Sequence, residues 1–173
     1  MLGKTKTDKA DKDNSNKGDA QLLVLIKKLN ERAQTLSIAE SCTGGLLSAQ
    51  LTSHAGISSI FFGGLVSYSN ESKQNLLDVP GSLIKAVGAV STPVALAMAR
   101  GVRERFNSSW SISITGIAGP NGGSPQKPVG TVCFAICGPG IEETSTQFFS
   151  GARKEIQNSS AKFAVEFLTK FLK

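Results

Sequence analysis

Apolar and polar residues alternate with two different periods along the chain, and these periods separate predicted helices from predicted strands. Residues 20–33 repeat leucine and isoleucine every three or four positions, which is typical of a helix with one buried side. The same spacing predicts helices over residues 46–51, 71–77, 82–87 and 94–106, and a last helix after residue 151. Short apolar or alternating runs predict strands over residues 36–39, 60–68, 110–115, 129–137 and 144–149.

Proline and glycine residues mark the boundaries of these segments. Pro80 ends one predicted helix, and Pro93 follows Ser91 at the start of a later one. Glycines at 138 and 140 join the last two strands as a hairpin, for which we expect a long connection. Because helices alternate with strands before a late hairpin, we predict an α/β fold with helices on both faces of a mixed, mainly parallel sheet.

Residues 1–19 differ from the rest of the chain, since Leu2 is their only large apolar residue. Such a segment buries too little surface to offset the entropy lost on ordering. We therefore predict a disordered polar tail over residues 1–19 and one domain over residues 20–173.

Composition narrows the class of protein. No apolar run approaches the roughly 18 residues of a membrane span, and the first residues contain no secretory signal, so we expect a cytoplasmic protein without membrane contact. One histidine and three scattered cysteines do not favour a metal site, and we expect no metal or cofactor. The net charge of +6 suits an anionic small molecule better than nucleic acid, because the lysines are scattered and stacking aromatics are few.

Three reactive or hydrogen-bonding side chains follow the strand predicted at 36–39. Ser41, Cys42 and Thr43 precede Gly44 and Gly45, after which a helix is predicted. A strand, a reactive residue, glycines and a helix together present a side chain at a helix N-terminus, where N–H groups favour an anion. A simple helix cap followed by turn glycines is the alternative.

A serine nucleophile needs a base, and the histidine is not placed to supply it. His54 lies about three helical turns beyond Ser41, roughly 15 Å away, and no G-x-S-x-G elbow is present. Tyr68, Lys73 and Lys127 are the remaining candidates, and a lysine base must be desolvated to lose its proton. A solvated lysine and a sheet-edge tyrosine are the structural alternatives.

The cysteines offer a competing nucleophile. Cys42 would have a lowered pKa if its thiol lay at a helix N-terminus, although a small buried residue is the simpler interpretation. Cys133 and Cys137 are four residues apart in a strand and are interpreted as core residues.

Three loops follow predicted strands and are expected to bind ligand: residues 40–45, 69–70 and 116–127. The last of these can form an anion cradle, because glycines let backbone N–H groups approach a phosphate and Lys127 adds positive charge. It does not match the P-loop pattern.

Four motifs resemble one known family, the CinA C-terminal domain family, which includes the nicotinamide-nucleotide amidases. They are the segments 39–45 (AESCTGG), 66–73 (VSYSNESK), 88–91 (GAVS) and 115–123 (TGIAGPNGG), the last followed by KPVGT at 127–131. The resemblance runs from about Ala20 to the end, without the larger N-terminal domain of full-length CinA proteins, and therefore implies a stand-alone form.

The resemblance implies a three-layer α/β/α fold and hydrolysis of the carboxamide of nicotinamide mononucleotide to nicotinate mononucleotide and ammonia. It implies Ser41 as nucleophile, with Tyr68 and Lys73 as the base. We expect a homo-oligomer. The residues expected to bind substrate are Glu40, Thr43, Gly44, Gly45, Asn70, Thr115, Gly116, Gly119, Gly122, Gly123 and Lys127, and placing the phosphate on the 115–127 loop is our own inference.

The chain departs from the family pattern at three places. The family commonly has Gly-Asp-Arg before the last helix and often an arginine four residues later, whereas this chain has Ala152 and Gln157 at the differing positions. Asp78 replaces a usual glycine. The changed stretch near Ala152 supports a non-catalytic nucleotide-binding regulator as an alternative to the serine amidase. A cysteine hydrolase using Cys42 is a third hypothesis.

Overall fold

The computed structural model describes residues 20–172. The predicted disordered tail over residues 1–19 lies outside the described residues. A helix spans residues 20–31. The later elements, in chain order, are β1 (Leu36–Glu40), α2 (Leu46–Thr52), the short 3-10 helix η1 (Ile57–Ser59), β2 (Phe61–Val66), α3 (Asn70–Leu77), α4 (Gly81–Val87), α5 (Thr92–Phe106), β3 (Trp110–Gly116), β4 (Thr131–Gly138), β5 (Ile141–Phe148) and α6 (Arg153–Thr169).

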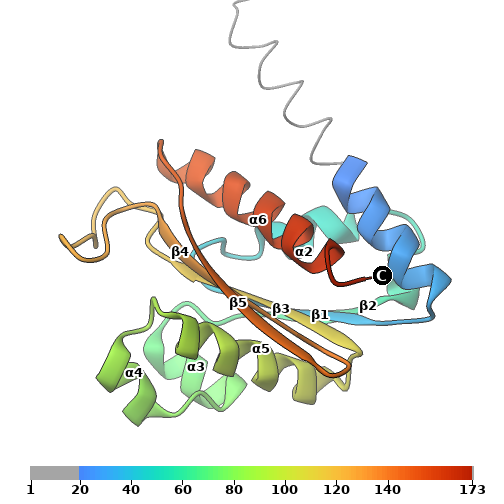
Figure 1. The fold of residues 1–173 in the computed structure, drawn as a ribbon, viewed down its shortest axis with the longest axis horizontal. Helices are drawn as coiled ribbons and strands as arrows, with labels where there is room; N and C mark the ends of the chain where they lie inside the picture. Colours follow the sequence, from blue (N-terminus) through green and yellow to red (C-terminus); the bar gives the residue numbers. More distant parts are fainter. Residues whose placement is uncertain (1–19, 173) are drawn as a thin grey trace, which may run out of the picture.

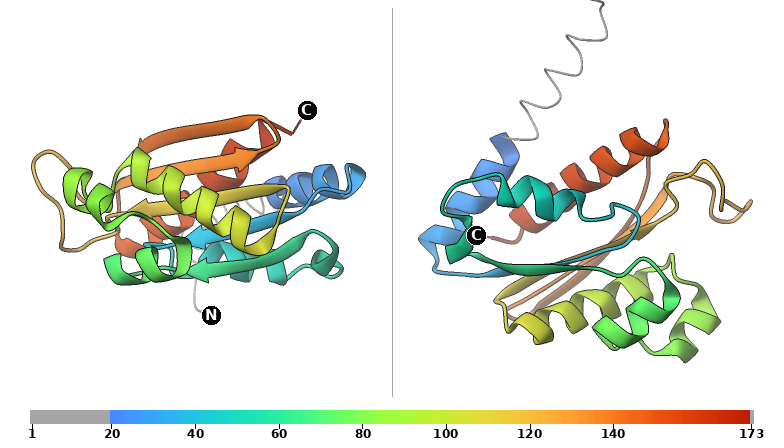
Figure 2. Two further views of the ribbon diagram at one scale, coloured as in Figure 1. Left: turned by 90° about the horizontal axis from the view of Figure 1, so that it is seen from below. Right: turned by 180° about the vertical axis from the view of Figure 1, so that it is seen from behind.

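One sheet lies between two layers of helices. The strand order is β2-β1-β3-β4-β5. The helix over residues 20–31, α2 and α6 cover one face, and α3, α4 and α5 cover the other (Figures 1 and 2). The predicted α/β sandwich with helices on both faces of a mixed sheet is therefore confirmed.

The sheet is divided evenly between parallel and antiparallel pairs, so the expectation of a mainly parallel sheet is corrected. β1 pairs in parallel with β2 and β3, whereas β3 with β4 and β4 with β5 are antiparallel. The late hairpin supplies both antiparallel pairs. Its turn is also tighter than expected, because only Pro139 and Gly140 separate the strands and Gly140 has a φ of 71°.

The topology brings three loops to one edge of the sheet. β1 is buried along its whole length because it lies between two strands and under both helical layers. Glu40, at its end, is in register with Val66 of β2 and Ile114 of β3. The residues that follow β1, β2 and β3 therefore emerge together, as is usual for ligand sites of α/β folds.

Hydroxyl groups attach α5 closely to the sheet. Ser111 Oγ donates to the Ala99 carbonyl at 2.7 Å, and Ser113 Oγ donates to the Ala95 carbonyl at 2.6 Å. These serines are fully buried, so the bonds satisfy groups that would otherwise be costly to bury. The helix is thus fixed relative to the strands that carry the candidate site.

A glycine then fixes α3 against α5. A side chain at Gly101 would place its Cβ only 2.0 Å from the Leu77 carbonyl oxygen. Only glycine therefore permits this approach. The contact determines how α3, and with it Lys73, is held beneath the sheet edge.

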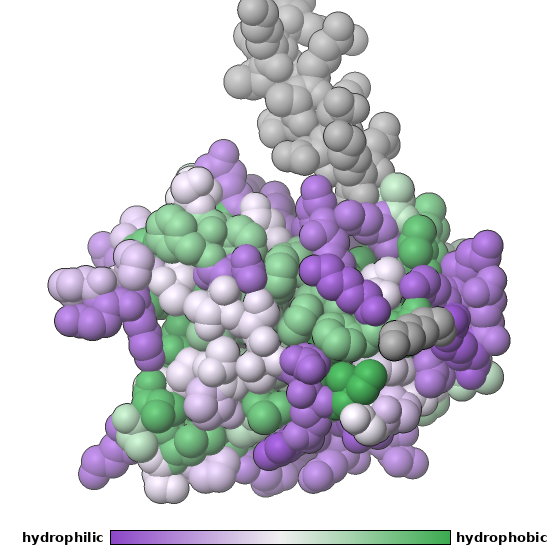
Figure 3. All heavy atoms as spheres, in the orientation of Figure 1, coloured by the Kyte–Doolittle hydropathy of each residue, from purple (hydrophilic) through white to green (hydrophobic). Residues whose placement is uncertain are grey.

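Among the described residues, no helix is both long enough and apolar enough to cross a membrane. Polar and apolar residues are interspersed over the face shown in Figure 3.

Candidate active site

Ser41 is the first residue after β1 and is held by backbone bonds on both sides. Its N–H donates to the Ile114 carbonyl at 3.0 Å, and its carbonyl accepts from the Gly44 N–H at 3.0 Å. Gly44 and Gly45 have φ values of 62° and 96°, which side chains rarely adopt. The glycine pair therefore forms the sharp turn into α2 that the sequence predicted.

Glu40 stabilises this turn from inside the protein. One carboxylate oxygen accepts from the N–H groups of Gly45 and Leu47 at 3.1 and 3.2 Å, and the other accepts from the N–H and hydroxyl of Ser48 at 2.8 and 2.7 Å. Glu40 is buried, with both oxygens occupied. Glu40 therefore stabilises the start of α2, since a negative charge at a helix N-terminus is stabilising there, and its expected role in substrate binding stays a prediction.

Lys73 reaches Ser41 from α3. Ser69 caps this helix together with Ser72 and so fixes its first turn. Lys73 is only 1% exposed, and its Nζ lies 3.0 Å from Ser41 Oγ and 2.7 Å from the Ser67 carbonyl oxygen. The predicted contact between Ser41 and Lys73 is confirmed, and the solvated-lysine alternative is wrong.

The surroundings of Lys73 favour its neutral form. Lys73 forms no ion pair with any carboxylate in the described part of the chain. Burial lowers the pKa of its ammonium group below the ordinary value. A neutral amine can donate to the Ser67 carbonyl and still accept the proton of Ser41, which is what a general base must do.

Cys42 lacks the properties of a nucleophile. Its side chain is buried, and burial raises the pKa of its thiol to about 12. The thiolate is therefore scarce near neutral pH, which disfavours the cysteine hydrolase. Cys133 and Cys137 are buried against α5, in agreement with their interpretation as core residues.

Tyr68 lies at the rim of the site and contacts neither Ser41 nor Lys73 by a hydrogen bond. It is 59% exposed, and its hydroxyl accepts a bond from Arg153 Nη2 at 2.7 Å. Arg153 Nη1 donates to the Gly119 carbonyl at 2.8 Å. The geometry therefore shows no path by which Tyr68 passes a proton between Ser41 and Lys73.

A cavity of about 230 Å³ opens over Ser41. Its walls come from the ends of β1 and β3, from the residue that follows Ser67 and from the start of α6. The lining residues are Ser41, Cys42, Tyr68, Gly116, Ile117, Ala118, Gly119, Asn121, Gly122 and Arg153. Ser41 is thus accessible to a ligand, whereas Lys73 is covered behind it.

Arg153, and not Lys127, is the cationic residue in the lining of this cavity. Lys127 Nζ donates to the carbonyls of Val87 and Val90 at 2.9 and 2.7 Å and does not line the cavity. Two donors of the Lys127 ammonium group are thus used at and just beyond the end of α4, and its expected phosphate contact stays a prediction. Arg153 was missed although the resemblance included it, since nothing in the sequence placed it beside residues 116–122.

The other expected binding residues fall into two groups. Gly116, Gly119 and Gly122 line the cavity. The remaining ones lie outside the lining, and their expected substrate contacts stay predictions. Thr115 is buried and donates to the Ala89 carbonyl at 3.0 Å, and Gly123 packs against the backbone of Val129. The others outside the lining are Thr43, Gly44, Gly45 and the exposed Asn70 of the first turn of α3.

Two N–H groups next to the nucleophile are candidates for an oxyanion hole. Those of Gly44 and Gly45 already donate to Ser41 and Glu40. Among the described residues, the N–H groups of Cys42 and Thr43 donate to no oxygen. Backbone donors without an acceptor beside a nucleophile are suited to stabilise negative charge that develops on a substrate oxygen.

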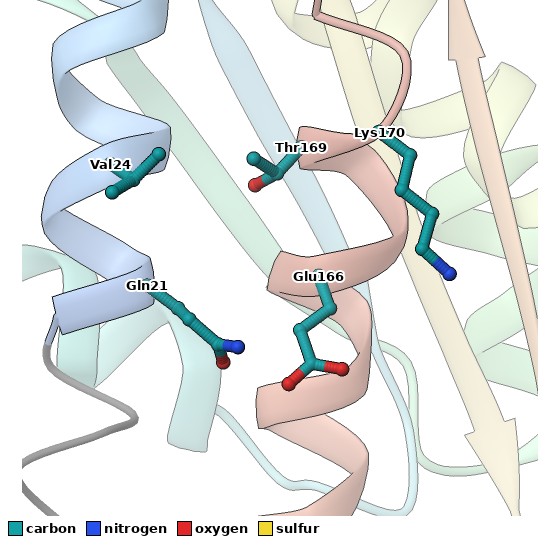
Figure 4. Close-up of a pocket in the computed structure, with 5 residues that line it drawn as sticks. All are labelled: Gln21, Val24, Glu166, Thr169 and Lys170. Atoms are coloured by element: carbon teal, nitrogen blue, oxygen red, sulfur yellow. The ribbon is translucent and has the colours of Figure 1, made fainter.

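A second cavity, of about 370 Å³, lies between the helix over residues 20–31 and α6 (Figure 4). Gln21 and Val24 of the first helix face Glu166 and Thr169 of α6, and Lys170 completes the lining. No serine or cysteine lines this cavity. The smaller cavity over Ser41 is therefore the candidate active site. The described residues contain no group of three potential metal ligands.

An α/β/α sandwich with a buried serine–lysine pair at its sheet edge defines a class of candidate hydrolases, and comparison with known proteins gives the family. Residues 20–172 match the family described as CinA C-terminal domain, and the chain belongs to this family. It is similar to a CinA-like protein of Parasynechococcus marenigrum, with 52% identity over 131 residues that cover 75% of this chain and 31% of the relative. A CinA-like protein of Prochlorococcus marinus is 48% identical over 151 residues, covering 86% of this chain and 36% of that protein. The chain thus spans about a third of the length of these relatives.

Solved structures show the same fold. A competence or damage-inducible protein from Enterobacter asburiae has a TM-score of 0.87 at 34% identity, with 90% of this chain and 98% of that chain covered. A CinA superfamily protein from Klebsiella pneumoniae has a TM-score of 0.86 at 32% identity, with 90% and 97% covered.

Proposed function

We propose that this domain hydrolyses the carboxamide of nicotinamide mononucleotide to nicotinate mononucleotide and ammonia, with Ser41 as nucleophile and Lys73 as base. The observation that carries the proposal is the 3.0 Å contact between Ser41 Oγ and a buried Lys73 that has no carboxylate partner among the described residues. Family membership supports a CinA-like function, and the resemblance supplies the nucleotide substrate.

The reaction follows from the positions of these groups. Neutral Lys73 takes the Ser41 proton as Oγ attacks the carboxamide carbon, and the N–H groups of Cys42 and Thr43 stabilise the oxyanion. The C–N bond then breaks, the proton on Lys73 passes to the departing ammonia, and a serine ester is left. Water hydrolyses this ester with Lys73 again as base. The Ser67 carbonyl keeps the amine oriented throughout.

The cavity suits an anionic nucleotide. Arg153 is the cationic residue in its lining, and three of the six lining residues from the 116–122 segment are glycines. In our proposal the phosphate binds the guanidinium of Arg153, which matches phosphate geometry better than an ammonium does. The ring of Tyr68 then lies beside the nucleotide at the rim.

The alternative is a regulator that binds the nucleotide without turnover. It rests on the departure at Ala152, whose side chain cannot cap α6 beside Arg153, although Glu155 accepts from the Ala152 N–H at 2.6 Å. The intact contact between Ser41 and Lys73 favours the amidase, because a binding module needs no buried base. A cytoplasmic location and a homo-oligomeric state stay predictions.

Ammonia release from nicotinamide mononucleotide tests the proposal. Wild type, Ser41→Ala and Cys42→Ala are assayed together, with thermal unfolding of each variant as the control for folding. We expect Ser41→Ala to abolish release and Cys42→Ala to retain most of it. Binding of the nucleotide without release by wild type would support the regulator instead.

A further inference from the structure

Of the first three carbonyls in the turn after β1, those of Ser41, Cys42 and Thr43, the middle one is not bonded within the turn. The Ser41 carbonyl accepts from the Gly44 N–H at 3.0 Å, and the Thr43 carbonyl accepts from the Leu46 N–H at 3.2 Å. The Cys42 carbonyl, between them, accepts from a side chain of another element, Gln157 Nε2 of α6, at 2.8 Å. The orientation of the peptide between Cys42 and Thr43 therefore depends on α6.

This peptide controls a donor that the proposed reaction uses. A trans peptide is planar, and its C=O and N–H point in opposite directions. With the Cys42 carbonyl held toward α6, the N–H of Thr43 is turned away from α6, and it donates to no oxygen among the described residues. Rotation of the peptide would exchange the two groups and present a carbonyl oxygen where a donor is needed.

We propose that Gln157 is a positioning residue, which fixes the Cys42–Thr43 peptide and so holds the oxyanion donors and Ser41 in their reactive arrangement. This inference rests on the proposed serine chemistry but not on the identity of the substrate. Gln157 is absent from the cavity lining, so it acts through the backbone of Cys42 rather than on a ligand.

The test uses two variants that lose the donor and one that keeps it. Gln157→Met has similar length without an N–H group, and Gln157→Glu has the same length but only acceptors near pH 8. Gln157→Arg keeps an N–H donor. Asn158→Ala, at the next and exposed position of α6, is the matched control. Thermal unfolding is measured for each variant. If one donor-free variant does not fold, the other is used for the test.

Two readouts separate positioning from substrate binding. The first is kcat and KM for nicotinamide mononucleotide, and the second is the rate at which a fluorophosphonate labels Ser41. We expect both donor-free variants to lower kcat and the labelling rate about tenfold to a hundredfold, with KM changed less than about threefold. Gln157→Arg is expected to stay within about threefold of wild type, and Asn158→Ala to match it.

Labelling of folded Gln157→Met or Gln157→Glu at the wild-type rate would overturn the inference. An increase in KM with unchanged kcat would also overturn it, because Gln157 would then contact substrate. Labelling of wild-type Ser41 without ammonia release would refute the proposed substrate, while the labelling rates of the variants would still decide the role of Gln157.

Discussion

Replacement of Lys73 by methionine is expected to stabilise the protein while it removes activity. The change removes two hydrogen bonds, to the Ser67 carbonyl and to Ser41, each worth about 1 kcal/mol net. It also removes the cost of burying a group that is an ammonium ion in the unfolded chain at pH 7 and gives up its proton on folding, which is up to several kcal/mol. We therefore expect a net stabilisation of about 1–3 kcal/mol at pH 7, or a rise in Tm of roughly 3–9 °C.

The stabilisation should depend on pH in a defined direction. Burial lowers the pKa of Lys73 in the folded state below its ordinary value of 10.5. Between the two pKa values the unfolded chain binds a proton that the folded protein does not, so wild-type stability rises with pH relative to the variant. The advantage of Lys73→Met is thus full below the folded pKa and fades as the pH approaches 10.5.

Thermal unfolding of wild type and variant at pH 7 and pH 10 measures this difference. Lys85→Met is the matched control, because Lys85 is an exposed lysine in the last turn of α4. Its difference from wild type should be small and independent of pH. A Lys73→Met protein less stable than wild type at both pH values, or an advantage unchanged at pH 10, would refute the neutral buried base.

Ammonia release by Lys73→Met should fall at least about a hundredfold.

Two further predictions concern the start of α6. Arg153→Met should raise the KM for nicotinamide mononucleotide about tenfold to a hundredfold, because a charged donor leaves the cavity wall. An equal effect on nicotinamide riboside, which lacks the phosphate, would contradict the assigned contact. Ala152→Asp should stabilise the protein by about 1 kcal/mol, since Ala152 occupies the N-cap of α6 without a capping side chain. An unchanged Tm in a thermal unfolding experiment would contradict this prediction.

Much of the fold could be predicted because periodicity records which faces are buried. The leucine repeat over residues 20–31 and the short, mostly apolar run over residues 36–39 both reflect burial in the sandwich. The balance of strand directions could not be predicted in the same way, because it depends on which neighbours pair. The glycines at 138 and 140 indicated a hairpin but not the two-residue turn that extends β5 back to Ile141.

The candidate site was partly predictable for a related reason. Ser41 and Lys73 each follow a strand whose carboxyl end lies at the same sheet edge, so their meeting was expected. The positively charged residues of the site were harder to predict, because the sequence does not show which side-chain donors already have hydrogen-bond acceptors. Lys127 is occupied by two carbonyls, while Arg153, distant in sequence, lines the cavity because α6 begins there.

The sequence likewise did not show which groups the carboxylate beside the nucleophile contacts. Glu40 looked available next to Ser41, yet the first turn of α2 occupies both of its oxygens. Hydrogen bonds of this kind are set by the three-dimensional course of the chain. Pattern alone therefore predicted the contact between Ser41 and Lys73 better than it predicted which polar groups already have hydrogen-bond partners.

The measurement that tests the central claim most directly is the mass of the protein quenched during turnover of nicotinamide mononucleotide, followed by peptide mapping. The account predicts an acyl adduct of the nicotinate nucleotide on the peptide that contains Ser41, located at Ser41 by fragmentation and absent from Ser41→Ala. An adduct on Cys42, or undiminished ammonia release by Ser41→Ala, would contradict it.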